Sequence, residues 1–213
     1  MEILPSYLKE KDNLEYVLKK IKDANKSLPK EKRIHEIHVD VMDKDFVDGE
    51  GVNILDYKKI VEEGFLADIH IMARDVEKYI SKITDYQNIS ITIHAEIENV
   101  EEILKKYANK VPLGISLNPD TDVNELKKYF KYISRILVMS VYPGKGGQKY
   151  IEETTKKLEM LYNIKPEDVK VIVDGGINDL TISKVKADKV VVGSYITDNL
   201  ENNLEEKILR LES

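Results

Sequence analysis

Short apolar runs alternate along the chain with longer charged segments in which apolar residues recur at helical spacing. We expect the apolar runs to form strands and the segments between them to form helices. The strands are predicted at residues 2–4, 34–41, 67–72, 89–94, 112–117, 135–140, 169–173 and 189–193. The helices are predicted at residues 12–24, 54–63, 75–85, 97–107, 123–131, 150–162, 179–185 and 200–211. The pattern indicates βα units repeated from one end of the chain to the other.

Eight such units predict an α/β fold, a (β/α)8 or TIM barrel, with residues 1–213 in a single domain. No Pro-, Gly- or Ser-rich linker divides the sequence. A doubly wound open sheet is the alternative. The strand near residues 37–42 favours the barrel, because aliphatic residues occupy one parity and His38, Asp40 and Met42 the other. In a barrel this second set points inward near the carboxyl ends of the strands, where active sites of this fold lie.

Ligand-type side chains end three of the predicted strands. His38 and Asp40 share one strand, His70 has the inward parity of the next, and Asp174 ends the seventh. Two imidazoles and two carboxylates suit Zn²⁺, Fe²⁺, Mn²⁺ or Co²⁺ better than Ca²⁺ or Cu⁺. Such inward groups would make a poor apolar core, because each unpaired buried polar group costs about 1–3 kcal/mol. We therefore expect these four residues to bind one divalent metal ion.

The two remaining histidines are excluded from the predicted catalytic set. A single strand histidine is more often a hydrogen-bonded structural residue than a ligand. His35 has the opposite parity to His38, so we expect it to cover a helix or to reach solvent. His94 ends its strand with inward parity, where a hydrogen bond to a ligand and contact with substrate are equally open.

Glycine-rich turns follow the last three strands. They contain Gly144, Gly146, Gly147, Gly175, Gly176 and Gly193, the last of these followed by Ser194. Glycines in turns are usually only structural. Three such turns on adjacent strands nevertheless fit a phosphate site, because glycine amides approach an anion closely and barrels often bind phosphate after the seventh and eighth strands. Lys145 is expected to add positive charge from a lid.

The composition of the chain limits the partners that it is expected to bind and its expected location in the cell. With 33 basic and 39 acidic residues, a net charge of −6 and no basic cluster, the chain is not expected to bind nucleic acid. The absence of cysteine excludes disulfides, thiolate metal sites and cysteine nucleophiles, and it fits a reducing compartment. The apolar stretches are strand-sized, and no positive segment followed by an apolar run opens the sequence. We expect a cytoplasmic location without membrane insertion.

Several short motifs resemble, in order and spacing, those of the ribulose-phosphate 3-epimerase family over nearly the whole length. The motifs are Pro5-Ser6-Tyr7-Leu8, His38-Val39-Asp40-Val41-Met42-Asp43, Asp68-Ile69-His70-Ile71-Met72, Leu117-Asn118-Pro119, Val138-Met139-Ser140-Val141 with Pro143-Gly144 and Gly146-Gly147-Gln148, Val173-Asp174-Gly175-Gly176-Ile177, and Val192-Gly193-Ser194. The resemblance implies a TIM-barrel isomerase of the pentose phosphate pathway that binds one divalent metal ion. It also implies a phosphorylated ketose as substrate, D-ribulose 5-phosphate or D-xylulose 5-phosphate, and association into homo-oligomers.

The resemblance also implies a role for each matched residue. His38, Asp40, His70 and Asp174 match the metal ligands, and Asp40 and Asp174 match the two acid/base carboxylates. The implied substrate-binding set adds Ser6, His70, Met42, Met72 and Met139 to the glycines and Ser194 named above. Carboxylates on the second and seventh strands suit epimerisation at C3, because one removes a proton from one face and the other returns a proton to the opposite face. The metal would stabilise the enediolate between these steps.

Two loops depart from the family pattern. Residues 44–49 differ from the usual Gly-His-Phe-Val-Pro-Asn, and Lys145 stands where an aromatic residue is usual. Both loops belong to the entrance, so D-allulose 6-phosphate or a related ketose phosphate is the nearest alternative substrate. Phosphosugar decarboxylases and synthases are disfavoured, because their Asp-x-Lys-x-x-Asp motif is missing at Asp68. A barrel that binds phosphosugars without catalysis is the alternative from a different class.

Overall fold

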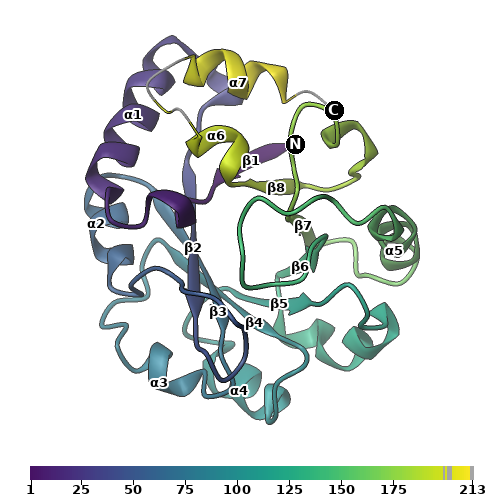
Figure 1. The fold of residues 1–213 in the computed structure, drawn as a ribbon. Helices are drawn as coiled ribbons and strands as arrows, with labels where there is room; N and C mark the ends of the chain where they lie inside the picture. The colour runs from purple at the N-terminus through teal and green to yellow at the C-terminus, as the bar shows by residue number, and fades with distance from the viewer. Residues whose placement is uncertain (199, 201–202, 212–213) are drawn as a thin grey trace.

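A computed structural model describes residues 1–198, 200 and 203–211. Its strands form one parallel sheet in the order β1-β8-β7-β6-β5-β4-β3-β2, curled into a barrel with helices outside (Figure 1). They are β1 (Glu2–Pro5), β2 (Glu36–Met42), β3 (Leu66–Met72), β4 (Ile89–His94), β5 (Leu113–Leu117), β6 (Arg135–Met139), β7 (Lys170–Asp174) and β8 (Lys189–Val192). A bridge between Ser6 and His38 joins the two edges. The TIM barrel is confirmed, and all eight strands lie within two residues of their predicted ends.

The outer helices are less regular than the sequence predicts. The α-helices are α1 (Leu14–Ser27), α2 (Asp56–Glu62), α3 (Glu77–Ile80), α4 (Val100–Tyr107), α5 (Glu153–Tyr162), α6 (Ser194–Thr197) and α7 (Leu204–Arg210). The 3₁₀ helices are η1 (Leu8–Glu10), η2 (Lys30–Lys32), η3 (Val123–Tyr132) and η4 (Ile182–Lys184). The predictions of α-helices at residues 123–131 and 179–185 were therefore wrong in type, and α6 was missed. Residues 201 and 202 of the last predicted helix lie outside the described residues.

A side chain that bonds to the backbone explains one of the shortened helices. Beyond α3, the amide of Thr84 donates to Tyr57 Oη at 3.0 Å. The sequence predicted α3 to continue to residue 85, but this contact with α2 takes the amide away from the helix.

No helix in the described ranges is long and apolar enough to span a membrane.

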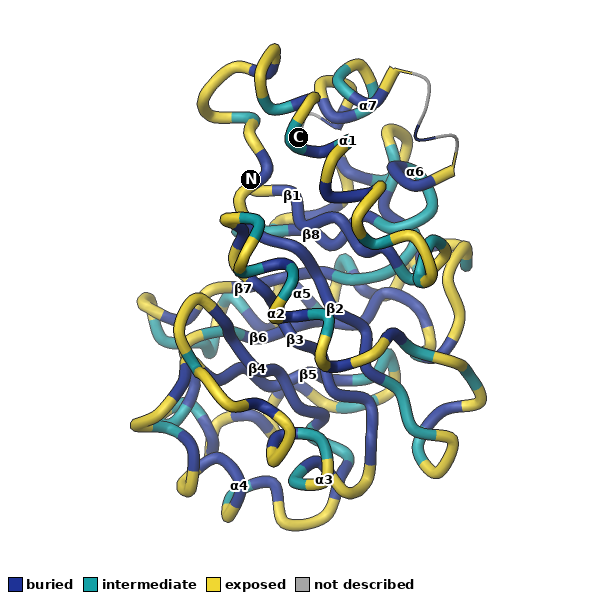
Figure 2. The backbone as a smooth tube through the Cα atoms, turned by 90° about the vertical axis from the view of Figure 1, so that its left-hand side faces the viewer, coloured by how far each residue is buried: buried dark blue, intermediate teal, exposed yellow. Residues whose placement is uncertain are grey.

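The core lies on both faces of the sheet, and the strands are buried along most of their length (Figure 2). The outer face packs aliphatic side chains against the helices. The interior of the barrel is divided between an apolar group and a polar group. The apolar group comes from β1, β6, β7, β8 and the residues just after β6, and it comprises Leu4, Leu137, Met139, Val141, Ile172 and Val191. Strands β2, β3 and β4 contribute the buried polar side chains of His38, Asp40, Asp68, His70, Ser90, Thr92 and His94.

Candidate metal centre and active site

Four predicted ligands meet inside the barrel, at the carboxyl ends of β2, β3 and β7. One donor atom from each of His38, Asp40, His70 and Asp174 lies within 4.8 Å of all the others. Strand register produces this cluster, because parallel pairing sets Asp40 beside His70 on adjacent strands. The two-residue period then turns His38 inward on the same face as Asp40.

Two imidazole nitrogens in this cluster face the carboxylates and have no hydrogen-bond partner among the described residues: His38 Nε2 and His70 Nδ1. His38 Nε2 lies 3.3 Å from Asp40 Oδ1 and 3.7 Å from Asp174 Oδ2. His70 Nδ1 lies 3.7 Å and 3.9 Å from the same two oxygens. Ligand atoms bound about 2.1 Å from one ion lie about 3–4 Å from each other. The spacing and the two buried imidazole nitrogens without hydrogen-bond partners therefore fit one divalent cation.

A second layer of hydrogen bonds orients His38. Its Nδ1 lies 2.8 Å from Asp68 Oδ2, and Asp68 Oδ1 accepts hydrogen bonds from Ser90 Oγ at 2.9 Å and Arg135 Nη1 at 3.1 Å. Burial raises the pKa of Asp68, but the hydrogen bond and charge of His38, together with Arg135 and Ser90, hold it well below its usual range. An ionised Asp68 accepts a hydrogen bond from Nδ1–H of His38, and this bond directs Nε2 toward the cluster.

The other two histidines lie where their parity places them. His94 is buried behind His70, with the two Nε2 atoms 2.9 Å apart. Of the two roles left open for His94, the structure therefore shows the hydrogen bond to a predicted ligand. His35 is exposed at the other end of the strand region, as predicted.

The two carboxylates experience different electrostatic environments. Burial raises the pKa of Asp40, but His38 and His70 outweigh this effect and hold it well below its usual range. Burial raises the pKa of Asp174 to about 7, where repulsion from Asp40 and Asp68 adds to burial and His38 opposes it. Burial also lowers the pKa of His70 to about 4. Carboxylates with opposite pKa shifts in one site are typical of an acid/base pair.

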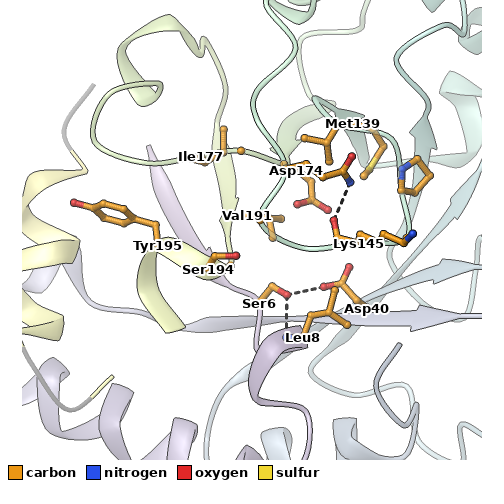
Figure 3. Close-up of a pocket in the computed structure, with 18 of the residues that line it drawn as sticks. Ser6, Leu8, Asp40, Met139, Lys145, Asp174, Ile177, Val191, Ser194 and Tyr195 are labelled. Carbon is orange, nitrogen blue, oxygen red and sulfur yellow. Dashed lines mark hydrogen bonds between the residues drawn. The ribbon is translucent and has the colours of Figure 1, made fainter. Parts of the chain in front are cut away.

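A cavity of about 420 Å³ opens above the cluster (Figure 3). Asp40 and Asp174 lie near each other beside Ser6, while Ser194 and Tyr195 lie farther along the cavity. The predicted substrate residues that line it are Ser6, Met42, Met72, Met139, Gly144, Gly147, Gly175, Gly176, Gly193 and Ser194. Two members of the predicted set, His70 and Gly146, lie outside this lining. His70 is covered because its ring lies under the cavity, where it is 0% exposed.

The cavity wall also contains residues that the sequence did not reveal. Leu8, Asn178, Tyr195, Asp198 and Lys207 line it together with the predicted residues. Lys9 Nζ forms an ion pair with Asp198 at 3.1 Å, joining η1 to the segment after α6. Apart from Leu8, which belongs to the motif Pro5-Ser6-Tyr7-Leu8, these positions lie outside the motifs, and the fold alone brings them to the cavity. Lys145 lies at the rim, as predicted, with its Nζ 3.6 Å from Asp48 of the other departing loop.

Comparison with known proteins agrees with the motifs. Residues 13–197 match the model of the Ribulose-phosphate 3 epimerase family. The ribulose-phosphate 3-epimerase of Encephalitozoon cuniculi is 36% identical over 166 residues, 76% of this chain and 74% of that protein. The corresponding protein of Escherichia coli K12 is 31% identical over 172 residues, 76% of each.

Solved structures with low sequence identity share the fold. A 3-hexulose-6-phosphate synthase aligns over 99% of this chain and 98% of its own, with a TM-score of 0.63 and 12% identity. Phosphoribosyl anthranilate isomerase from Thermus thermophilus aligns over 99% and 96%, with a TM-score of 0.63 and 14% identity. These likenesses concern the barrel alone. The family model and the sequence relatives go further: this chain belongs to the ribulose-phosphate 3-epimerase family.

Proposed function

We propose that the chain interconverts D-ribulose 5-phosphate and D-xylulose 5-phosphate by moving the proton at C3. One observation carries this proposal: Asp40 and Asp174 line a single cavity, beside two buried imidazole nitrogens that lack hydrogen-bond partners among the described residues. Membership of the family supports the same reaction.

Epimerisation requires two proton transfers on opposite faces of one carbon. Asp40 lies two residues before the end of β2 and Asp174 ends β7, and these strands are three positions apart around the barrel, so the two carboxylates can approach a bound sugar from different directions. A divalent ion held by His38, Asp40, His70 and Asp174 would supply positive charge that stabilises the charge developing on the ketose oxygens. Ser6 Oγ donates to Asp40 Oδ2 at 2.6 Å and so keeps Oδ1 turned toward the histidines.

The remaining wall of the cavity supports water exclusion and phosphate binding. Met42, Met72 and Met139 provide a soft apolar lining that limits water near the reacting carbon. The turns at Gly175 and Gly193 border the same cavity and offer backbone amides to an anion. A ketose whose C3 lies at the carboxylates can therefore place its phosphate against these turns.

A turnover assay combined with metal analysis tests the proposal. We expect about one divalent ion per chain, loss of activity after chelation, and recovery with Zn²⁺, Fe²⁺, Mn²⁺ or Co²⁺. We expect a higher kcat/KM for D-ribulose 5-phosphate than for D-allulose 6-phosphate, and a much lower one for unphosphorylated ribulose. Full activity in metal-free protein would refute the mechanism. Phosphosugar binding without turnover by the metal-loaded protein would instead favour the non-catalytic barrel.

A cytoplasmic location and self-association remain predictions. The first rests on composition, and the second rests on the family resemblance. Light scattering coupled to size-exclusion chromatography tests self-association, for which we expect a mass above that of one 24.5 kDa chain.

A further inference from the structure

Two polar residues behind His70 have no part in the reaction proposed above. His94 ends β4, and its Nε2 lies 2.9 Å from His70 Nε2. On the other side of the ring, His94 Nδ1 lies 3.0 Å from Glu96 Oε2. A continuous line of contacts therefore runs from Glu96 through His94 to His70.

The direction of the hydrogen bonds along this line is set at Glu96. Its Oε1 accepts hydrogen bonds from the amide of Asn118 at 2.7 Å and from Thr121 Oγ1. Burial raises the pKa of Glu96, but the hydrogen bonds from His94, Asn118 and Thr121 outweigh burial and lower it. An ionised carboxylate can only accept hydrogen bonds. Glu96 Oε2 must therefore accept a hydrogen bond from Nδ1–H of His94.

That direction determines which nitrogen of His70 carries a proton. With one proton on each ring, His94 holds its proton on Nδ1 and its Nε2 can only accept. The short contact between the two Nε2 atoms then requires His70 to donate from Nε2. Its Nδ1 keeps a free lone pair, and this is the buried nitrogen that faces Asp40 and Asp174 without a hydrogen-bond partner among the described residues.

The surroundings protect this arrangement from solvent. The His94 side chain is 0% exposed and that of Glu96 is 22% exposed. The ring of Phe46 packs at a tilt against His94 with centroids 4.8 Å apart, and the rings of His70 and His94 meet edge to edge, with their planes 22° apart. Lys157 Nζ donates to the carbonyls of Asn118, Pro119 and Thr121, and so holds the turn that binds Glu96.

We propose that Glu96 is a positioning residue that acts through His94 to hold His70 in the tautomer protonated on Nε2, with the Nδ1 lone pair directed into the metal site. The functional value of this tautomer rests on the metal site proposed above. The tautomer itself depends only on the hydrogen bonds of the protein, so the two can be tested separately.

Glu96→Gln is the decisive variant, because it keeps the shape of the side chain and reverses the direction of the hydrogen bond to His94. The amide of Asn118 and the hydroxyl of Thr121 still need an acceptor, so the glutamine oxygen should remain there and its NH₂ group should face His94. His94 Nδ1 would then accept, its Nε2 would donate, and His70 would carry its proton on Nδ1. Glu98→Gln, an exposed change two residues away, is the matched control.

Long-range ¹H–¹⁵N correlation of the imidazole rings reads the tautomers directly, and the 213-residue chain has four histidines to assign. With chelator present, we expect the Nε2–H form of His70 in the wild type and in Glu98→Gln, and the Nδ1–H form in Glu96→Gln. Glu96→Ala removes the acceptor without adding a donor, so it should give a mixture and provides a second test if Glu96→Gln does not fold. Unchanged His70 signals in folded Glu96→Gln, or in folded Glu96→Ala, would overturn the proposal.

Competition between the protein and a chelator for Zn²⁺ tests whether the tautomer of His70 affects metal affinity. We expect affinity to fall at least tenfold in Glu96→Gln and to stay unchanged in Glu98→Gln. A wild-type protein that bound no Zn²⁺ would refute the proposed metal function, whereas the tautomer spectra would still decide the role of Glu96. Reduced Zn²⁺ affinity in Glu96→Gln with a wild-type His70 tautomer would also count against the proposal, because the loss would then have another cause.

Discussion

Asp40 and Asp174 are the same residue type within one cluster, yet their neighbours shift their pKa values in opposite directions. Asp40 accepts a hydrogen bond from Ser6 Oγ and lies 3.3 Å from His38 Nε2. Asp174 has the longer contact with His38, 3.7 Å, and is repelled by Asp40 and Asp68. Chemical role at the residue scale therefore follows from the partners around each carboxylate.

Because they lie on different strands, β2 and β7, and are proposed to serve opposite faces of C3, the two carboxylates are separable by isotope exchange. Asp40→Asn and Asp174→Asn should each lower kcat for net epimerisation by about 10²–10⁴-fold, because each change removes one proton-transfer group. In deuterated water, each variant should exchange the C3 proton of only one epimer, and the two variants should prefer different epimers. Metal content is measured first, because both residues are proposed ligands. Equal exchange of both epimers by a metal-loaded variant would show that one base serves both faces.

The histidines give a second residue-scale prediction. His70→Ala should lower metal occupancy at least tenfold, because it removes a buried nitrogen of the cluster. His35→Ala is the control, since His35 is exposed and has the opposite parity. Inductively coupled plasma mass spectrometry on both purified variants measures the occupancy. Equal occupancy in the two variants would contradict the assignment of His70.

At the scale of elements, the loop after β2 is tied to α3 through one carboxylate. Asp43 Oδ2 accepts hydrogen bonds from Tyr79 Oη at 2.7 Å and Lys78 Nζ at 2.9 Å. These two hydrogen bonds, with that from the amide of Asp45, lower the pKa of Asp43 to about 2. The loop that carries Phe46 onto His94 is therefore anchored at its first residue.

Asp43→Asn should lower the free energy of unfolding by about 1 kcal/mol near pH 6, a modest value because Lys78 is largely exposed. The pKa of Asp43 is depressed on folding, so its stabilisation is present above about pH 4 and is lost as pH falls toward about 2. The difference from the wild type should therefore shrink between pH 6 and pH 3 in urea unfolding. Asp48→Asn, at a fully exposed carboxylate of the same loop, should show no such difference. If Asp43→Asn lowered the free energy of unfolding equally at every pH, the stabilisation by Asp43 would not depend on its charge.

The glycine turns after β7 and β8 differ in what their backbones meet. A Cβ atom on Gly176 would lie 2.4 Å from the amide nitrogen of Tyr150, and its φ is +66°. A Cβ atom on Gly193 would have no heavy atom closer than 3.9 Å. Substitution at Gly193 can therefore probe the phosphate site, whereas substitution at Gly176 would also disturb the fold.

Gly193→Val should raise KM for the phosphorylated ketose about tenfold or more and leave metal content unchanged, because the larger side chain would project toward the anion. Gly176→Val should lower the unfolding midpoint through its clash with Tyr150. Steady-state kinetics and thermal unfolding measure the two effects. An unchanged KM in Gly193→Val would place the phosphate elsewhere.

At the scale of the molecule, buried charges join strands at the amino-terminal end of the barrel. Arg135 Nη1 donates to Glu36 Oε1 and Asp68 Oδ1, each at 3.1 Å, and Lys189 also pairs with Glu36. These residues belong to β2, β3, β6 and β8. The same Asp68 orients His38, so the stability of the barrel and the geometry of the metal cluster share one buried carboxylate.

Arg135→Met should lower the free energy of unfolding by about 1–3 kcal/mol, because it removes one charged donor from two buried carboxylates: Glu36 keeps Lys189, and Asp68 keeps His38 and Ser90. Arg210→Met removes an exposed pair with Glu206 and should cost less than about 1 kcal/mol. Urea unfolding of both variants measures the difference. Equal, small effects would show that the buried cluster adds little to stability.

Sequence alone determined the barrel and the inward ligands, because the direction of a side chain in a strand alternates with a period of two and is a local property. That period placed His38, Asp40 and His70 on one face, and glycines marked the turns that border the cavity. Only the tertiary structure decided the lengths and types of the outer helices; beyond α3, for example, Tyr57 takes up the backbone amide of Thr84. It also decided the opposite pKa shifts of the two carboxylates and the line from Glu96 to His70. These depend on distances between residues far apart in the chain, such as the 22 positions between Glu96 and Asn118, and on burial, and no local pattern encodes either.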